Sequence, residues 1–324
     1  MLAAAGALAL TAPAAAQAMP GTGGAVPAFC GGTGPIRAAD LAAAVSLNGC
    51  ELRGRLVVQS AGAAHIGVRV PPPGRAEGAE AATTSGDRVL VVSNTGGHVS
   101  ATTSFRPVPA PAPADVTPAT DPACNELAAA YLGFVWVETL NWFYNQSTVS
   151  RAGLDGPTTR DEIRQANRNI TLGINNCGWS ETGFGAFGAY QGTTDKFANI
   201  NSAAECTSKF PDGQNTVSWG PFDSNEADTL ALTCFEYDTG GNRFAIEADT
   251  YLGSNRRLVT SFSPFCSDSF DLQSVMTHEW GHSYGLDHVN APHLVMYDFQ
   301  SACALRRHLG EGDYAGMAHL YGLR

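Results

Sequence analysis

Residues 278–288 read HEWGHSYGLDH, and these eleven positions hold three of the eight histidines of the 324-residue chain. On an α-helix, His278 and His282 lie one turn apart on the same face, so both imidazoles can bind one metal ion. Gly285 can adopt the left-handed conformation that ends a helix, after which the chain can bring His288 back to the ion. Three neutral nitrogen ligands with a fourth position open for water are typical of catalytic zinc, so the stretch predicts a Zn²⁺ site.

Glu279 directly follows the first predicted ligand. Its side chain projects about 100° around the helix from His278, close enough to reach a water molecule at the metal but not placed as a ligand. We therefore expect Glu279 to act as a general base and then to deliver the proton to a leaving amine. The alternative is an ordinary solvated helix carboxylate. Asp287 precedes the third ligand and could bond to a histidine N–H or simply cap a turn.

The N-terminal residues 1–18 form an apolar, alanine-rich run that ends in Ala16-Gln17-Ala18. A run of this length with a small-x-small ending predicts a signal peptide rather than a membrane span, although no Lys or Arg precedes it. We therefore expect a secreted, extracellular protein with no membrane segment after signal removal. The net charge of −11 argues against nucleic acid and anionic membrane surfaces as partners.

Eight cysteines, an even number, favour disulfides in an exported protein. Their order along the chain suggests Cys30 with Cys50 and, among the other six, pairing of sequential neighbours. Connectivity is not determined by sequence alone, so other pairings stay open. The six are Cys124, Cys177, Cys206, Cys234, Cys266 and Cys303.

The chain divides at a proline-rich segment, residues 106–123, which predicts an extended linker. Before it, residues 27–105 contain short β-rich runs between Gly- and Pro-rich turns, which predict a small N-terminal β domain. After it, residues 124–324 contain strand-like and helical stretches that indicate an α+β domain with one mixed sheet. The expected strands are 134–137, 187–190, 216–219, 230–235 and 244–251, and the expected helices are 160–175 from a capping box at Thr159, a metal-binding helix with Asp271 as N-cap, and 311–321.

The extended histidine motif together with residues 294–297, LVMY, resembles the metzincin metalloproteases. DLQSV at 271–275, GLDH at 285–288 and the flanks of the last predicted helix are similar to the matrixin branch of that family. The resemblance covers residues 124–324 and is densest after Phe270. It implies a metzincin-like catalytic domain with a mixed twisted sheet, an active-site helix and a C-terminal helix, and it implies that Met296 forms the Met-turn beneath the metal.

The same resemblance implies that Leu230, Ala231, Leu232 and Thr233 form the edge strand that pairs with an extended peptide substrate, although an ordinary inner strand is an equal alternative. Calcium is a further possible ligand, for which the acids Asp223, Asp228 and Asp238 are candidates. No recognisable cysteine-switch propeptide is present, and a Cys30–Cys50 disulfide is favoured over Cys30 as a metal ligand.

These observations predict a secreted, monomeric zinc endopeptidase that hydrolyses extended polypeptides with Glu279 as base. The alternative is a binding or adhesion protein that keeps the zinc fold as a platform and acts through its N-terminal domain. A latent module whose N-terminal domain blocks the cleft is a third interpretation. An intact Glu279 argues against the idle platform, because such a protein has no need of the base.

Overall fold

A computed structural model of the chain describes residues 26–105, 121–263 and 265–324. The predicted signal peptide, residues 1–18, and most of the predicted linker lie outside the described residues. Within the described part, no helix is both long enough and apolar enough to cross a membrane. The predicted α+β class is confirmed.

The described residues contain one large mixed sheet and two small ones. The large sheet has nine strands in the order β2-β7-β6-β5-β11-β12-β10-β8-β9, while β1, β3 and β4 form a three-stranded sheet and β13 pairs with β14. The strands are β1 (Ile36–Arg37), β2 (Val45–Ser46), β3 (Leu56–Ala61), β4 (Ala64–Arg69), β5 (Arg75–Thr83), β6 (Arg88–Thr95), β7 (His98–Phe105), β8 (Leu140–Tyr144), β9 (Gly188–Thr193), β10 (Asn215–Gly220), β11 (Thr229–Asp238), β12 (Ala245–Gly253), β13 (Leu258–Val259) and β14 (Phe270–Asp271).

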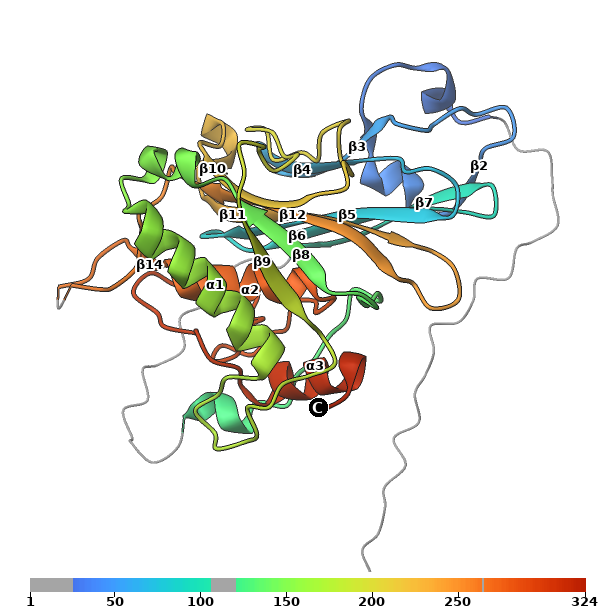
Figure 1. The fold of residues 1–324 in the computed structure, drawn as a ribbon. Coiled ribbons are helices and arrows are strands. Elements are labelled where there is room, and N and C mark those ends of the chain that lie inside the picture. The colour runs from blue at the N-terminus through green and yellow to red at the C-terminus, as the bar shows by residue number, and fades with distance from the viewer. Residues whose placement is uncertain (1–25, 106–120, 264) are drawn as a thin grey trace, which may run out of the picture.

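Three layers build the molecule, as Figure 1 shows, with the small β1-β3-β4 sheet above the large sheet and the helices below it. The helices are α1 (Gly156–Leu172), α2 (Leu272–Ser283) and α3 (Glu311–Tyr321), with short 3-10 helices at Ala28–Gly31, Ala38–Leu41, Pro122–Asn125, Gln146–Ala152 and Ser224–Glu226. One hydrophobic core lies between the large sheet and the helices, and a second lies between the two sheets. The central strands of the large sheet, β5 and β11, are therefore buried on both faces.

Helix α1 begins earlier than its sequence predicts. Its N-cap is Asp155, whose carboxylate accepts hydrogen bonds from the amide N and the hydroxyl of Thr158 (2.9 and 2.7 Å), and Pro157 occupies the first turn. The predicted capping box at Thr159 is therefore wrong, because proline fits the first turn of a helix and the helix begins before Thr159. The start of α2 after Asp271 and the bounds of α3 are confirmed.

The expected strand at 134–137 is wrong, since it makes only an isolated bridge between Val135 and Phe244. The apolar residues of this segment serve packing instead: Phe134 is 2% exposed and packs against Phe235 and Tyr237. The other four predicted strands correspond to β9, β10, β11 and β12, while β8 was not predicted.

Four of the N-terminal strands, β2, β5, β6 and β7, belong to the large sheet rather than to a separate one. β5 pairs antiparallel with β11 along Arg75–Thr83, and β6, β7 and β2 continue the same sheet outward. Strand β11 therefore lies between β5 and β12 and is not an edge strand in this structure, contrary to the expectation for residues 230–233. The inner strand is thus the alternative that the structure has, and the sequence left the choice open because patterns within a strand do not reveal which distant strand pairs with it.

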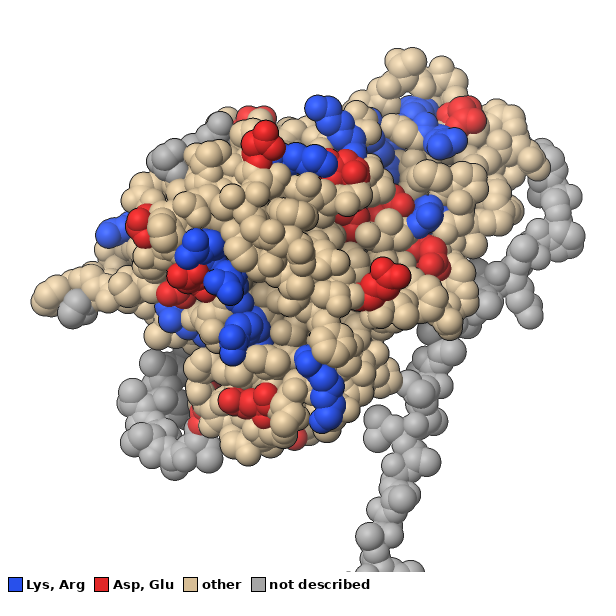
Figure 2. Space-filling model, viewed as in Figure 1, with Lys and Arg blue, Asp and Glu red and all other residues tan. Residues whose placement is uncertain are grey.

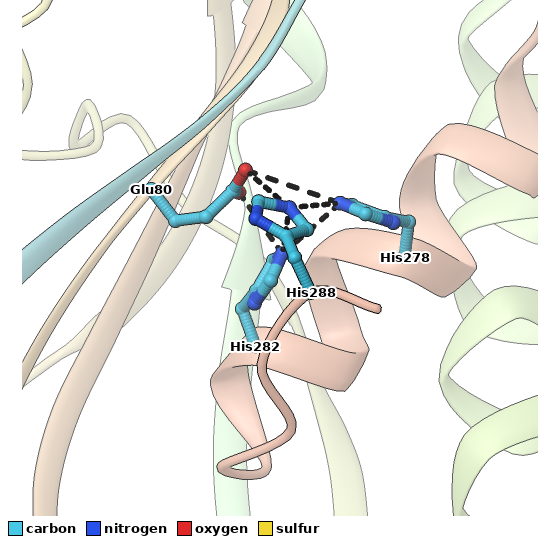
Figure 3. A group of neighbouring side chains, drawn as sticks. All are labelled: Glu80, His278, His282 and His288. Carbon is cyan, nitrogen blue, oxygen red and sulfur yellow. Dashed lines mark hydrogen bonds and ion pairs between the residues drawn. The ribbon is translucent and has the colours of Figure 1, made fainter. Parts of the chain in front are cut away.

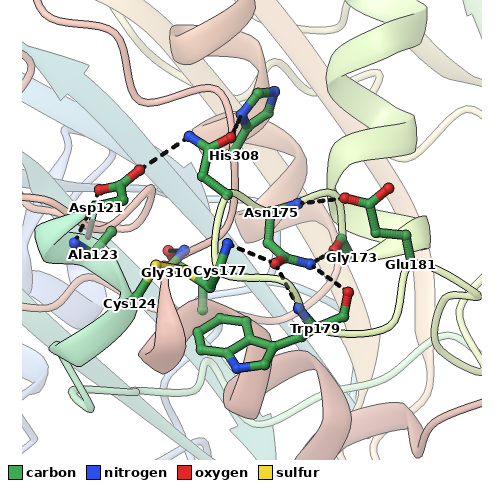
Figure 4. Close-up of a disulfide and its surroundings, with 12 residues drawn as sticks. Asp121, Ala123, Cys124, Gly173, Asn175, Cys177, Trp179, Glu181, His308 and Gly310 are labelled. Atoms are coloured by element: carbon green, nitrogen blue, oxygen red, sulfur yellow. Dashed lines mark hydrogen bonds between the residues drawn. A yellow bond between two sulfur atoms is a disulfide. The ribbon is translucent and has the colours of Figure 1, made fainter. Parts of the chain in front are cut away.

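Four disulfides join residues that are neighbours in the order of cysteines, which confirms the suggested pairing: Cys30–Cys50, Cys124–Cys177, Cys206–Cys234 and Cys266–Cys303. The second connects the 3-10 helix Pro122–Asn125 to the loop after α1 (Figure 4). In that loop, the side-chain oxygen of Asn175 accepts hydrogen bonds from the amides of Cys177 and Trp179 (2.9 and 3.1 Å). The disulfide and this turn together fix the end of α1.

Helix α1 has a basic outer face, although the chain is acidic overall. Figure 2 shows Lys and Arg side chains gathered along this helix, which carries Arg160, Arg164 and Arg168 at intervals of four residues. Its opposite face, with Ile163 and Ile170 fully buried, packs into the core beside α2. The amphipathic helix therefore covers α2 and separates it from solvent.

Candidate metal centre

Helix α2 passes through the core, and every one of its residues is buried. Its first turn is fixed by Asp271, which accepts hydrogen bonds from the amide and hydroxyl of Ser274 (2.8 and 2.7 Å) and from Nε of Arg307 (2.9 Å). A helix that is buried all round is expected to be apolar, yet α2 carries two histidines and a glutamate. Buried polar groups need partners, so these side chains mark a site.

The three predicted ligands converge. The Nε2 atom of His282 lies 3.0 Å from that of His278, and the Nε2 atom of His288 lies 3.1 Å from each of the other two. All three side chains are buried, and Figure 3 shows them directed at one point from α2 and from the loop that follows it.

Hydrogen bonds at the far side of two rings set their orientation. Nδ1 of His278 lies 2.8 Å from the carbonyl oxygen of Val295, and Nδ1 of His282 lies 3.0 Å from that of Leu286. Because a carbonyl only accepts, each Nδ1 carries the proton and each Nε2 presents a lone pair. Burial also lowers the pKa of His282 well below its usual value, which favours the neutral form that binds metals. Lone pairs that face one another in a buried site fit a bound cation such as Zn²⁺.

The turn to the third ligand requires glycine. Gly285 has φ +91°, and a Cβ there would lie 2.4 Å from the carbonyl oxygen of Phe134. The chain then folds back so that the amide of Leu286 donates to the carbonyl of Gly281 (2.9 Å), which places His288 beside the helix. This is the geometry that the spacing of the motif predicts.

Met296 lies against the metal-binding helix, since a Cβ on Gly281 would be only 2.2 Å from its sulfur. The loop that carries it is held by Asp313 of α3, whose carboxylate accepts from the amides of Val295 (2.8 Å) and Met296 (3.1 Å). Burial raises the pKa of Asp313 to about 6 despite these bonds. Met296 therefore packs against the helix that carries His278 and His282, and its role as the floor of the site stays a prediction.

Glu279 points to the large sheet and is fully buried. Its Oε2 atom accepts a short hydrogen bond from the hydroxyl of Thr233 on β11, which also contacts the hydroxyl of Thr250 (3.0 Å). Its other oxygen, Oε1, has no hydrogen-bond partner among the described residues. Burial, and next the charge of Glu80, raise the pKa of Glu279 well above its usual value. Thr233 thus contributes a side chain that orients Glu279, a role that the sequence did not reveal.

A fourth side chain, Glu80 of β5, completes the cluster and was missed by the sequence analysis. Its carboxylate oxygens lie 2.9 Å from Nε2 of His288, 3.3 Å from Nε2 of His282 and 3.9 Å from Nε2 of His278. Within the described part of the chain, these four residues are the group of three or more His, Cys, Asp or Glu side chains that could hold a metal ion. The only available signal was a pair of acids, Glu77 and Glu80, inside the alanine-rich run of β5.

Asp87, in the turn before β6, brings a second carboxylate, with Oδ2 3.2 Å from Nε2 of His288. Both oxygens of Glu80 and Oδ2 of Asp87 are buried without a hydrogen-bond partner among the described residues. Burial alone would raise the pKa of Glu80, but the nearby histidines lower it well below its usual value. Buried carboxylates that crowd three imidazoles are costly unless positive charge compensates them, and oxygen and nitrogen donors of this kind fit zinc.

Other residues singled out in the sequence lie away from this centre. Asp287 caps the amide of His288 (2.8 Å) rather than orienting an imidazole. Asp223, Asp228 and Asp238 do not form a metal-binding group among the described residues. Tyr297 contacts the guanidinium of Arg306 through its ring (5.1 Å). Calcium binding therefore stays a prediction.

Comparison with known proteins identifies the region that carries the site. Residues 185–322 match the matrixin family (Peptidase M10), which confirms the predicted resemblance to matrixin-like metzincins. A stretch of 61 residues is 43% identical to Matrix metalloproteinase-9 from the dog, Canis lupus familiaris. That stretch spans 18% of this chain and 8% of the relative.

Proposed function

We propose that this matrixin-like protein is a secreted zinc endopeptidase that hydrolyses peptide bonds in extended polypeptides. The observation that supports this most is the convergence of three histidine ring nitrogens, 3.0–3.1 Å apart, beside a buried glutamate that is not needed as a ligand. His278, His282 and His288 would hold the zinc, which when bound polarises a carbonyl and makes nearby water more acidic.

Each remaining step is carried by side chains of this chain. Glu279 takes a proton from the attacking water on one oxygen, while Thr233 holds the other oxygen and fixes the direction of the carboxylate. Glu279 then returns the proton to the nitrogen of the leaving amine. The buried surroundings exclude bulk water and keep the base directed at one place.

An extended substrate would add to the sheet beside the site. Thr229–Asp238 of β11 runs past the histidines, and Thr233 is the residue of this strand that contacts Glu279. A peptide that took the place of β5 on β11 would have its backbone held by strand hydrogen bonds and one peptide bond laid over the metal. We propose residues Leu230, Ala231, Leu232 and Thr233 as this substrate-binding segment.

The proposed setting is extracellular. Four disulfides fit an oxidising compartment, and the N-terminal run at 1–18 would direct export. We further propose that the protein acts as a monomer, that residues 124–324 form the catalytic part, and that residues 27–105 form a distinct N-terminal part despite sharing its sheet.

The test compares four purified full-length chains: wild type, Glu279→Gln, Glu80→Ala and the double variant. Zinc per chain is measured by elemental analysis, and cleavage of unfolded casein is followed with and without a chelator. About one zinc is expected in every chain, and any casein cleavage, by the wild type or by Glu80→Ala, should stop on chelation and on Glu279→Gln. Cleavage that persists without Glu279 contradicts its role, and absence of zinc contradicts the metal site. Zinc without cleavage in all four chains favours the alternative of an idle zinc platform.

A further inference from the structure

Strand β5 occupies the hydrogen-bonding edge of β11 that an extended substrate would need. Its residues pair antiparallel with β11 from Arg75 opposite Asp238 to Thr83 opposite Thr229. One side of a strand can form a ladder with only one partner. Pairing of β11 with β5 and pairing of β11 with an extended substrate therefore exclude each other.

The register of this pairing places a carboxylate at the metal centre. Glu80 lies opposite Thr233, the residue that contacts Glu279, and its side chain faces the helices (Figure 3). Gly78 and Ala82, two positions away on either side, share this face because side chains alternate along a strand. Among these, only Glu80 can provide a metal ligand, and its oxygens reach all three histidines within 3.9 Å.

Contacts away from the metal hold β5 and its neighbours in place. Arg88 and Glu226 form a fully buried ion pair (2.9 Å) between the start of β6 and the loop before β11. The amide of His65 donates to Glu226 (2.6 Å), and its ring lies 3.2 Å from Glu205. Glu205 also lies in the segment that pairs with Gly67 of β4. The N-terminal strands are thus fixed to residues 205–226 independently of the site.

From these observations we propose that β5 is an inhibitory segment: it takes the place of substrate on β11, and Glu80 takes the position at the zinc that the attacking water needs. The inference rests on the proposed function and deepens it by assigning its regulation. Hydrolysis begins only when β5 leaves β11. Glu80 rather than a cysteine occupies the position at the metal, because all eight described cysteines are paired in disulfides and none of them is free to be a ligand.

The test uses the full-length chain with Co²⁺ in place of zinc, and azide as a small anionic probe of the fourth ligand position. Visible absorption reports the ligands of cobalt whether or not the protein cleaves peptides. In the wild type, azide is expected to leave the spectrum unchanged. In Glu80→Ala, the spectrum itself should differ and azide should bind with a half-saturating concentration at least about tenfold lower. Glu80→Gln keeps the size of the side chain and should give an intermediate result.

Glu77→Gln is the matched control, since Glu77 is a buried acid of the same strand, directed to the opposite face. It should behave as the wild type. Equal azide binding by wild type and Glu80→Ala, or equal effects of the Glu77 and Glu80 variants, overturns the proposal. The two proposals fail separately: azide that enters only without Glu80, combined with no casein cleavage by a zinc-loaded chain from which β5 has been removed, refutes hydrolysis but retains the occlusion of the metal.

Discussion

The contact between Gly78 on β5 and Phe235 on β11 offers a way to loosen the strand without changing any metal ligand. The two residues are opposite each other, and a Cβ built on Gly78 would lie 2.3 Å from Cε2 and 2.4 Å from Cζ of the Phe235 ring. Carbon atoms normally approach to about 3.5–4.0 Å, so Gly78→Ala creates a deficit of more than about 1 Å. The ring cannot easily move away, because Phe134 and Tyr237 pack against it at centroid distances of 5.2 and 6.4 Å.

Overpacking of this kind costs about 1–3 kcal/mol. Separation of β5 from β11 relieves the clash, so a cost of about 2 kcal/mol should increase the population of the separated state about 30-fold. The measurement is native-state hydrogen exchange of the peptide 229–238, with the peptide 156–172 of α1 as an internal reference. We expect faster exchange in β11 and unchanged exchange in α1.

A second substitution identifies the cause. Gly78→Ala combined with Phe235→Leu should recover most of the protection of β11, because the smaller side chain leaves room for the new methyl group. Unchanged exchange of β11 in a folded Gly78→Ala chain would refute the reasoning. Equal acceleration in α1 would refute it too, since the variant would then weaken the whole fold rather than the pairing of β5.

Three further predictions concern the frame around the site. Gly281→Ala should lower stability by about 1–3 kcal/mol in thermal unfolding, because the new Cβ meets the sulfur of Met296 at 2.2 Å, and a more stable variant would contradict that contact. The pKa of Asp313 is about 6 in the folded chain, against the ordinary value of 3.8. Protonated Asp313 therefore adds about 3 kcal/mol to the free energy of unfolding, an effect that is complete below pH 3.8 and is lost as the pH rises through 6. The stability of wild type relative to Asp313→Asn, measured by denaturant unfolding with chelator present, should therefore fall between pH 4 and 7, and a constant difference would contradict the shift. Replacement of Cys206 and Cys234 by serine opens a loop of sequence separation 28 and should cost about 3–4 kcal/mol, whereas an unchanged denaturation midpoint would show that the loop is held by other contacts.

The metal-binding helix could be predicted because its determinants are local. The spacing of His278 and His282, the left-handed Gly285 and the cap at Asp271 each depend on residues within a few positions, and all three occur as expected. The start of α1 was misjudged because two capping residues compete, and the choice between Asp155 and Thr159 depends on the proline between them.

Glu80 could not be predicted for the opposite reason. It is nearly two hundred residues from His278 in the sequence, and its position at the metal depends on the register of β5 against β11. A shift of one residue would turn the carboxylate to the other face of the sheet. Nothing within the run GAEAAT specifies the partner strand, so the sequence indicated a strand region but not the strand beside it.

The buried charges explain why this register persists. Glu80, Asp87 and Glu279 lie together in a site closed to solvent, where three carboxylates would repel one another and lose their hydration. Removal of β5 would take the carboxylate of Glu80 away from Glu279 and the histidines. The closed arrangement is therefore favourable only when a cation compensates the charge, so zinc binding and the seating of β5 should stabilise each other. By the same linkage, loss of the metal should weaken the pairing of β5 with β11, and the strand that blocks the site depends on the ion that the site needs for hydrolysis.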